Sequence, residues 1–135
     1  MKLLYYLLPI FIIIYSSYSM PIVIADDEKI IEKTWGGYSL DVAEDVVVES
    51  EGSIFVVGWT ASRGRGEEDA LLLKYDQYGD LLWAKTWGEF NHDFASAIDI
   101  SEDNYVYVTG WTNSFVDKEF RDIFLLKYDY DGNLL

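Results

Sequence analysis

The chain contains no cysteine and a single histidine among its 135 residues. Without cysteine it can form no disulfide, no thiolate metal site and no thiol nucleophile. The one histidine, His92, supports neither a catalytic triad nor a histidine-rich metal site. Its place in a loop between two expected strands predicts a solvated side chain. We therefore predict no catalytic residue, no metal ligand and no bound cofactor.

Basic residues are also scarce, with 10 Lys and Arg against 24 Asp and Glu, for a formal net charge of −14. The first 25 residues contain one Lys and no acid, so the remainder carries 9 basic and 24 acidic groups, a net charge of −15. Such a surface repels phosphate backbones and predicts no nucleic-acid partner. We interpret the acidity as a source of solubility.

Apolar residues make up half of the chain and aromatic residues 17%. Much of this material is repeated: KTWG occurs at 33–36 and 85–88, GWT at 58–60 and 110–112, and a longer apolar segment at 69–76 and 122–129. The first two offsets are 52 residues and the third is 53. A repeat of this length, written in strand residues, is typical of a propeller blade.

The repeat predicts an all-β fold of two four-stranded antiparallel blades, a partial β-propeller over residues 26–135. Blade one covers 41–87 and blade two 93–135, after a blade-closing strand at 29–35. The expected strands are 41–49, 54–59, 70–75 and 81–87 in blade one, and 93–100, 105–111, 123–128 and a truncated outer strand at 134–135 in blade two.

Several expected strands are apolar on successive positions, such as 54–57 and 71–73. A sheet with one wet face would alternate, so these strands predict that both faces are covered. Gly58 and Gly110 lie late in their strands and predict a bulge or a close backbone approach.

Residues 1–25 form a separate unit: Lys2, an apolar run over 3–15, serines, and Ala25 before the first acids. This pattern matches an export signal cut after Ala25. The alternative is an uncleaved anchor formed by residues 3–24, which are numerous enough to span a bilayer. Both interpretations predict an extracellular or cell-surface location, and only the anchor makes the membrane a partner.

The order Thr-Trp-Gly, Asp-x-Ala, an apolar strand ending in Gly-Trp-Thr, and Asp-x-x-Leu-x-Lys-Tyr-Asp resembles the SBBP family of beta-propeller repeats. These repeats occur in exported and cell-surface proteins of bacteria and archaea. The resemblance implies four-stranded blades, commonly about six to eight in a ring. It implies no catalytic motif, because the family shares none.

Two blades leave their outer faces open, and exposed apolar faces drive association. One interpretation is a fragment of a longer propeller, favoured by the stop inside the last outer strand. Another is a ring of three or four chains, in which strand 29–35 of one chain completes blade two of the next. The third is a small open sandwich. The expected partners are therefore other propeller blades, or further copies that self-associate through the open faces.

Four acids open strands at repeated positions, and we expect them to cap turn amides. These acids are Asp41, Asp69, Asp93 and Asp122. The turn 129–133 begins like a calcium loop, but hairpin chemistry explains it as well. The repeated tryptophans favour core packing over sugar stacking. The segment 63–66, with two arginines, is too short to bind nucleic acid.

Two functional hypotheses follow. The first is a non-enzymatic exported propeller segment that acts as a scaffold or as a recognition surface for a protein or glycan ligand. The second is part of an exported propeller enzyme, of a quinoprotein-like or lyase-like kind, whose catalytic residues lie in other blades. This alternative rests on analogy, because a fold does not specify an activity.

Overall fold

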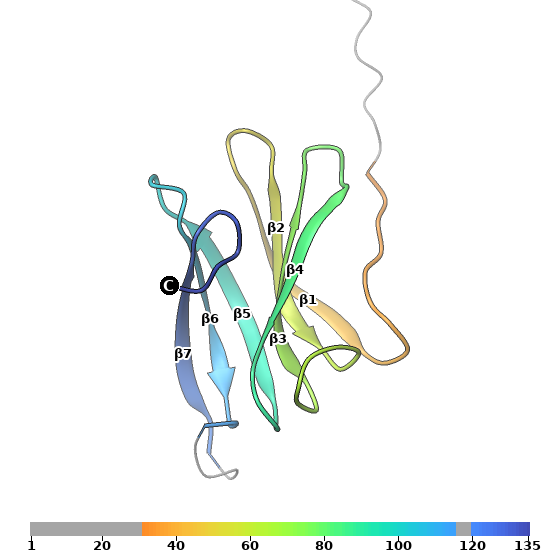
Figure 1. The fold of residues 1–135 in the computed structure, drawn as a ribbon, viewed down its shortest axis with the longest axis vertical. Coiled ribbons are helices and arrows are strands. Elements are labelled where there is room, and N and C mark those ends of the chain that lie inside the picture. The colour runs from red at the N-terminus through yellow and green to blue at the C-terminus, as the bar shows by residue number, and fades with distance from the viewer. Residues whose placement is uncertain (1–30, 116–119) are drawn as a thin grey trace, which may run out of the picture.

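The structure is a computed structural model that describes residues 31–115 and 120–135. In these ranges it has seven strands in two antiparallel sheets and no helix (Figure 1), which confirms the all-β prediction. No helix within the described ranges is long and apolar enough to cross a membrane. The predicted signal or anchor, residues 1–25, lies outside the described residues.

Blade one is a four-stranded meander in which each strand pairs with the next along the chain. Its strands are β1 (Asp41–Val48), β2 (Ile54–Thr60), β3 (Asp69–Tyr75) and β4 (Leu81–Trp87). Short turns with glycine at positive φ join them, such as Gly79 with φ +79° between β3 and β4.

Blade two has three strands, β5 (Asp93–Ile100), β6 (Val106–Thr112) and β7 (Asp122–Tyr128), in the same sequential order. The predicted outer strand is present only as an isolated antiparallel bridge between Leu134 and Tyr128. The described part of blade two therefore presents β7 as an edge strand.

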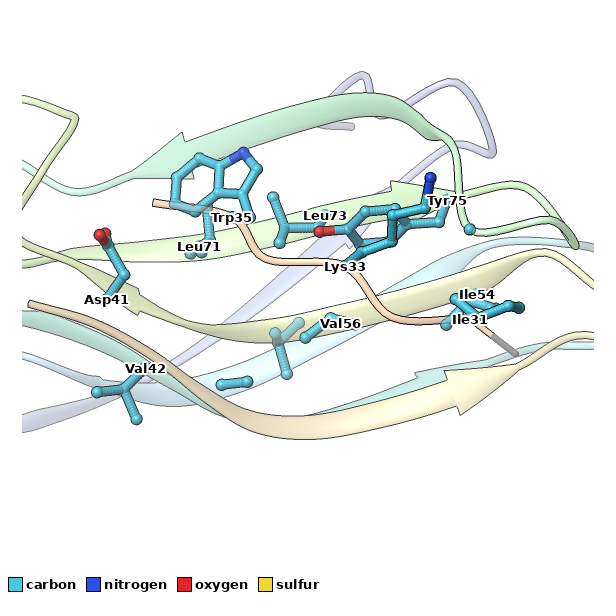
Figure 2. Close-up of a pocket in the computed structure, with 13 residues that line it drawn as sticks. Ile31, Lys33, Trp35, Asp41, Val42, Ile54, Val56, Leu71, Leu73 and Tyr75 are labelled. Atoms are coloured by element: carbon cyan, nitrogen blue, oxygen red, sulfur yellow. The ribbon is translucent and has the colours of Figure 1, made fainter. Parts of the chain in front are cut away.

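The prediction of a strand at 29–35 is wrong for its described part, because residues 31–35 form no strand. The segment runs over the face of blade one instead of lying in the plane of a sheet (Figure 2). A strand is defined by a ladder of hydrogen bonds to a neighbour, and no strand of the described chain pairs with this segment.

The two blades pack face to face, and their core lies between the sheets (Figure 1). Blade one contributes Phe55, Val57, Ala70 and Leu72, and blade two contributes Ala95, Val106, Val108, Phe124, Leu126 and Tyr128. Burial of this apolar area drives the association of the sheets.

Strand β3 is covered on both faces, because every residue from Asp69 to Lys74 is buried. Strand β7 alternates instead: Phe124 and Leu126 are buried, whereas Ile123 and Leu125 are exposed. The expected two-sided burial therefore holds for β3. The exposed side of β7 is an outer face, of the kind that two blades were expected to leave open among the described residues.

The glycines late in the second strands serve the predicted purpose. Opposite Gly58 the register shifts between Ala43 and Asp45, which marks a bulge in β1. A Cβ on Gly58 would overlap the carbonyl oxygen of Val42, and one on Gly110 would overlap that of Phe94. The prediction of a bulge with a close backbone approach is confirmed in both blades.

Tyr128 supplies a pH-dependent test of this packing. Burial raises the pKa of its phenol from 10.0 to about 12. Between pH 10 and 12 the Tyr128 phenol is therefore ionised in the unfolded state and still protonated in the folded state. Its contribution to stability is intact below pH 10 and is lost as the pH rises from 10 to 12. We expect a loss of about 2 to 3 kcal/mol over that window.

Urea unfolding of the wild type and of Tyr128→Phe between pH 9 and 12 measures this loss. The variant has no phenol to ionise at this position, so its stability should fall less steeply. Parallel curves for the two proteins would contradict the buried position of the hydroxyl.

Candidate functional site

Four loops meet at one end of the blades, where β1, β3, β5 and β7 begin and β2, β4 and β6 end (the lower end in Figure 1). We call the described residues of these loops the loop rim. It consists of residues 36–40, 61–68, 88–92 and 113–115 together with 120–121. Loops on a rigid sheet scaffold are common sites of function, so the rim is the first place to look for chemistry.

In blade one the rim is held together by Asp41. Its carboxylate accepts hydrogen bonds from the hydroxyl of Thr60, from Ser62 Oγ at 2.6 Å and from the amide of Gly37 at 3.0 Å. Burial raises the pKa of Asp41, but these hydrogen bonds outweigh it and hold the pKa below its usual value. The carboxylate thus ties the start of β1 to the end of β2.

Blade two repeats the arrangement around Asp93, which is fully buried. Asp93 accepts from the hydroxyl of Thr112, from Ser114 Oγ at 2.6 Å and from the amide of Glu89 at 3.1 Å. The prediction that these acids cap turn amides is confirmed for Asp41 and Asp93. Their serine and threonine partners were not predicted, although Thr-x-Ser occurs at the same place in both repeats.

Asp69 brings a second buried carboxylate to the junction of the blades, and it accepts from the Gly66 amide at 2.9 Å. Burial raises the pKa of Asp69, and the nearby charges of Asp93 and Glu89 raise it further. A Cβ on Gly88 would meet the carboxylates of both Asp69 and Asp93, so only glycine fits between them. Asp122, the matching acid of blade two, is exposed.

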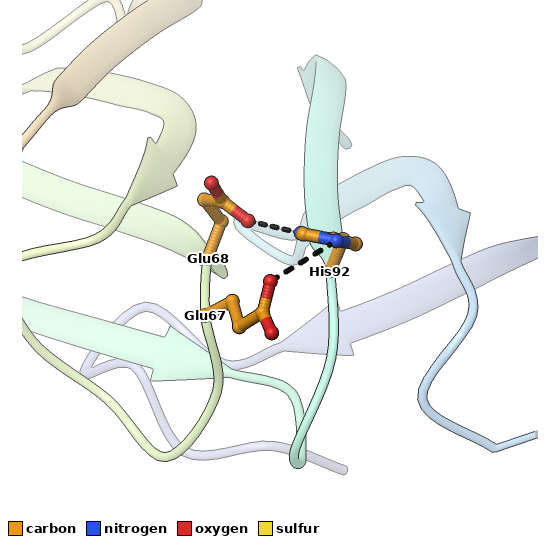
Figure 3. A group of neighbouring side chains, drawn as sticks. All are labelled: Glu67, Glu68 and His92. Atoms are coloured by element: carbon orange, nitrogen blue, oxygen red, sulfur yellow. Dashed lines mark hydrogen bonds and ion pairs between the residues drawn. The ribbon is translucent and has the colours of Figure 1, made fainter. Parts of the chain in front are cut away.

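His92 is not simply solvated, contrary to the prediction (Figure 3). Its Nε2 lies 3.3 Å from Glu67 Oε2, and its Nδ1 contacts Glu68 Oε2. The backbone fixes the pairing, because Glu68 and His92 form a parallel bridge and the Asp93 amide donates to the Glu68 carbonyl at 2.8 Å. The sequence could not reveal it, since the two loops lie 24 residues apart.

The three side chains are of types that bind divalent metals, and their ligand atoms lie within 4.8 Å of one another. The two ring nitrogens, however, face different carboxylates. We therefore assign the group as a set of polar contacts that links the loop before β3 to the loop before β5.

Aromatic rings line the junction of the blades near the rim. Phe94 lies between Trp59, at 4.9 Å, and Trp111, on which it stacks at 4.4 Å. The Arg121 guanidinium lies 3.9 Å from the centre of the Trp111 ring. These tryptophans pack in the structure, as their repetition predicted.

Other aromatic side chains of the rim are open to solvent. Phe90 is 77% exposed and Phe115 is 55% exposed, and Tyr38 and Phe120 are also exposed. Beside them lies the ion pair of Arg65 with Glu89, at 3.1 Å. Exposed rings among charged groups are a surface type that binds ligands.

A groove of about 390 Å³ lies on the outer face of blade one, under the segment 31–35 (Figure 2). We call it the blade-one groove. The segment covers it with Ile31, Lys33 and Trp35, and its floor is largely apolar. The floor includes Ile54, Val56, Leu71, Leu73 and Tyr75.

The turn 129–133 lies at the end of the blades opposite the loop rim. The carboxylate of its first residue, Asp129, accepts hydrogen bonds from within the turn. Asp129 accepts from the amides of Asp131 at 3.0 Å and Asn133 at 2.8 Å, and from the Asn133 side chain at 2.8 Å. The Asn133 hydrogen bonds hold the pKa of Asp129 below its usual value. Asp76 caps its own turn in the same way, as hairpin chemistry predicts.

Comparison with known proteins agrees with this architecture. The model of the SBBP family, described as a beta-propeller repeat, matches residues 77–115, a span that includes β4, β5 and β6. The predicted resemblance is confirmed, and the chain carries a beta-propeller repeat within a partial propeller. No curated protein matches the chain.

The capping carboxylates make a testable contribution to stability. Asp93→Ala leaves two hydroxyls and an amide of the buried junction without their acceptor. We expect a loss of about 3 kcal/mol or more in the free energy of unfolding, measured by urea denaturation. Asp122→Ala removes the same charge at an exposed position and should change stability by less than about 0.5 kcal/mol. Equal effects of the two substitutions would show that Asp93 does not brace the rim.

Proposed function

We propose that the chain is an exported beta-propeller segment that acts as a non-enzymatic scaffold and presents the loop rim to a protein or glycan ligand. One observation carries the proposal. The repeated carboxylates, Asp41 and Asp93, are committed to hydrogen bonds that build the rim, whereas the most exposed aromatic rings of the rim are free to contact a partner. The rim thus combines a base held by hydrogen bonds with exposed aromatic rings that can bind a ligand.

Export is supported by two features. Residues 1–25 have the composition of a signal or an anchor. The repeat itself is of a kind generally found in extracellular proteins. A fold that contains no cysteine needs no oxidising compartment, so its stability depends on packing wherever it resides.

The chemistry of the rim suits a sugar or a peptide with apolar groups. Phe90 lies in the loop before β5 and Phe115 in the loop between β6 and β7, and both can offer their ring faces to such groups. The neighbouring Arg65, Glu67 and Glu89 can donate or accept hydrogen bonds at the edge of that surface. The net negative charge of the protein disfavours polyanionic ligands.

Arrays of glycans and of extracellular proteins, probed with the full chain, test this function. We expect a ligand whose binding falls at least tenfold, or about 1.4 kcal/mol, in the double variant Phe90→Ser, Phe115→Ser. Tyr78→Ser removes an exposed ring at the opposite end and should leave binding unchanged. A ligand that is insensitive to the rim substitutions, or the absence of any bound ligand, would contradict a recognition role.

A further inference from the structure

The repeat places equivalent residues in the blade-one groove and in the core. Blade two meets blade one with a receiving surface of Val106, Val108, Phe124, Leu126 and Tyr128. Their repeat equivalents in blade one are Ile54, Val56, Leu71, Leu73 and Tyr75, which line the groove. The groove is therefore the same receiving surface, without a blade seated on it.

The matching half of this interface is exposed on blade two. Blade one inserts Phe55, Val57, Ala70 and Leu72 into the core, and each is at most 4% exposed. Their repeat equivalents are Tyr107, Thr109, Ile123 and Leu125. Of these, Ile123 is 86% exposed and Leu125 is 70% exposed. We call this surface the tail face.

The segment 31–35 lies on blade one as β4 lies on blade two. A Cβ on Gly79 would meet Ile31, and one on Gly132 would meet Trp83, the repeat equivalent of Ile31. The following turns agree as well, because each donates an amide to the aspartate that opens the next strand. The segment thus occupies the place of a blade's outer strand, although it pairs with no strand of the described chain.

Strand β7 offers the edge that such an outer strand would need. In blade one, β3 pairs with β4 from Ala70 opposite Trp87 to Tyr75 opposite Leu81. In blade two, Leu134 and Leu135 reach only the end of this edge, at Tyr128 and Lys127. The backbone edge from 123 to 126 has no strand beside it among the described residues.

We propose that a second copy of this chain docks on the tail face, with its groove over Ile123 and Leu125 and its segment 31–35 as the fourth strand of blade two. The register of β3 with β4 then places Trp35 of the second copy opposite Ile123, and its Lys33 opposite Leu125. Leu134 and Leu135 hold the places of Leu81 and Leu82, and the segment takes the next five places, those of residues 83–87.

The occupant is a second copy because the required surface is already present in the chain. The contact repeats the interface between the two blades, residue for residue, and so continues one that the structure contains. It also pairs an open apolar edge, which would otherwise invite nonspecific association. The contact is heterologous, so an open assembly keeps one free groove at one end and one free tail face at the other until a ring closes. The assembly does not depend on which ligand the loop rim binds.

Engineered cysteines test the register, because the natural chain has none. Full-length Lys33→Cys and Leu125→Cys proteins are mixed and oxidised mildly. We expect a disulfide-linked heterodimer in the mixture, since antiparallel partners lie within disulfide range. The pair Leu72→Cys, Lys85→Cys is the matched control, because the same two positions face each other within blade one and should form a disulfide inside one chain.

Light scattering gives a second readout. The wild type should have a mass of several chains, and Leu125→Glu should shift it to the monomer, whereas Tyr78→Glu, an exposed turn residue, should not. A control disulfide without the heterodimer would overturn the proposal, and so would a monomeric wild type. If the wild type is a monomer, labelling of the Leu125→Cys thiol with maleimide shows what covers the tail face. A protected thiol would mean that another segment of the same chain covers the tail face, and a reactive thiol would mean that the tail face is uncovered. Rim binding is measured independently, so the two proposals fail separately.

Discussion

The packing of one sheet face on the next is the constraint on which this structure depends. Several strands, such as β2 and β3, are apolar on successive positions, so neither blade can satisfy both of its faces alone. Phe55, Val57 and Leu72 of blade one are buried in one cluster with Val108 and Leu126 of blade two. The packing of the two sheets also holds the loops together at one end of the blades, and the loop rim is rigid because of it.

Polar groups fix the angle and register of that packing at both ends of the blades. At the rim, Asp69 and Asp93 lie on either side of Gly88, where there is room for no side chain. At the other end, Lys74 crosses the junction and donates to the Tyr130 carbonyl at 3.0 Å, with its Nζ 3.2 Å from the centre of the Tyr130 ring. Burial lowers the pKa of Lys74, and these contacts offset part of the cost of burying its charge.

Much of the fold could be predicted from the sequence, because the blade is a local and repeated unit. The strand at 41–49 was predicted one residue too long, and the role of Gly58 was confirmed. The errors concern neighbours that local pattern does not reveal. Residues 31–35 have strand composition but no strand of the described chain beside them to pair with, and His92 meets Glu68 only because the blades bring two distant loops together. Among the exposed rim aromatics, Tyr38 and Phe90 stand at equivalent repeat positions and could have been found from the sequence, whereas Phe115 and Phe120 have no aromatic counterpart.

Amide hydrogen exchange of the full chain, followed residue by residue at low and high protein concentration, tests the central claim most directly. The account predicts that β3, buried on both faces, exchanges only on global unfolding at either concentration. The amides of β7 should exchange faster in dilute protein and become as slow as those of β3 in concentrated protein. Fast exchange of β3 in dilute protein, or exchange of β7 that does not change with concentration, would contradict it.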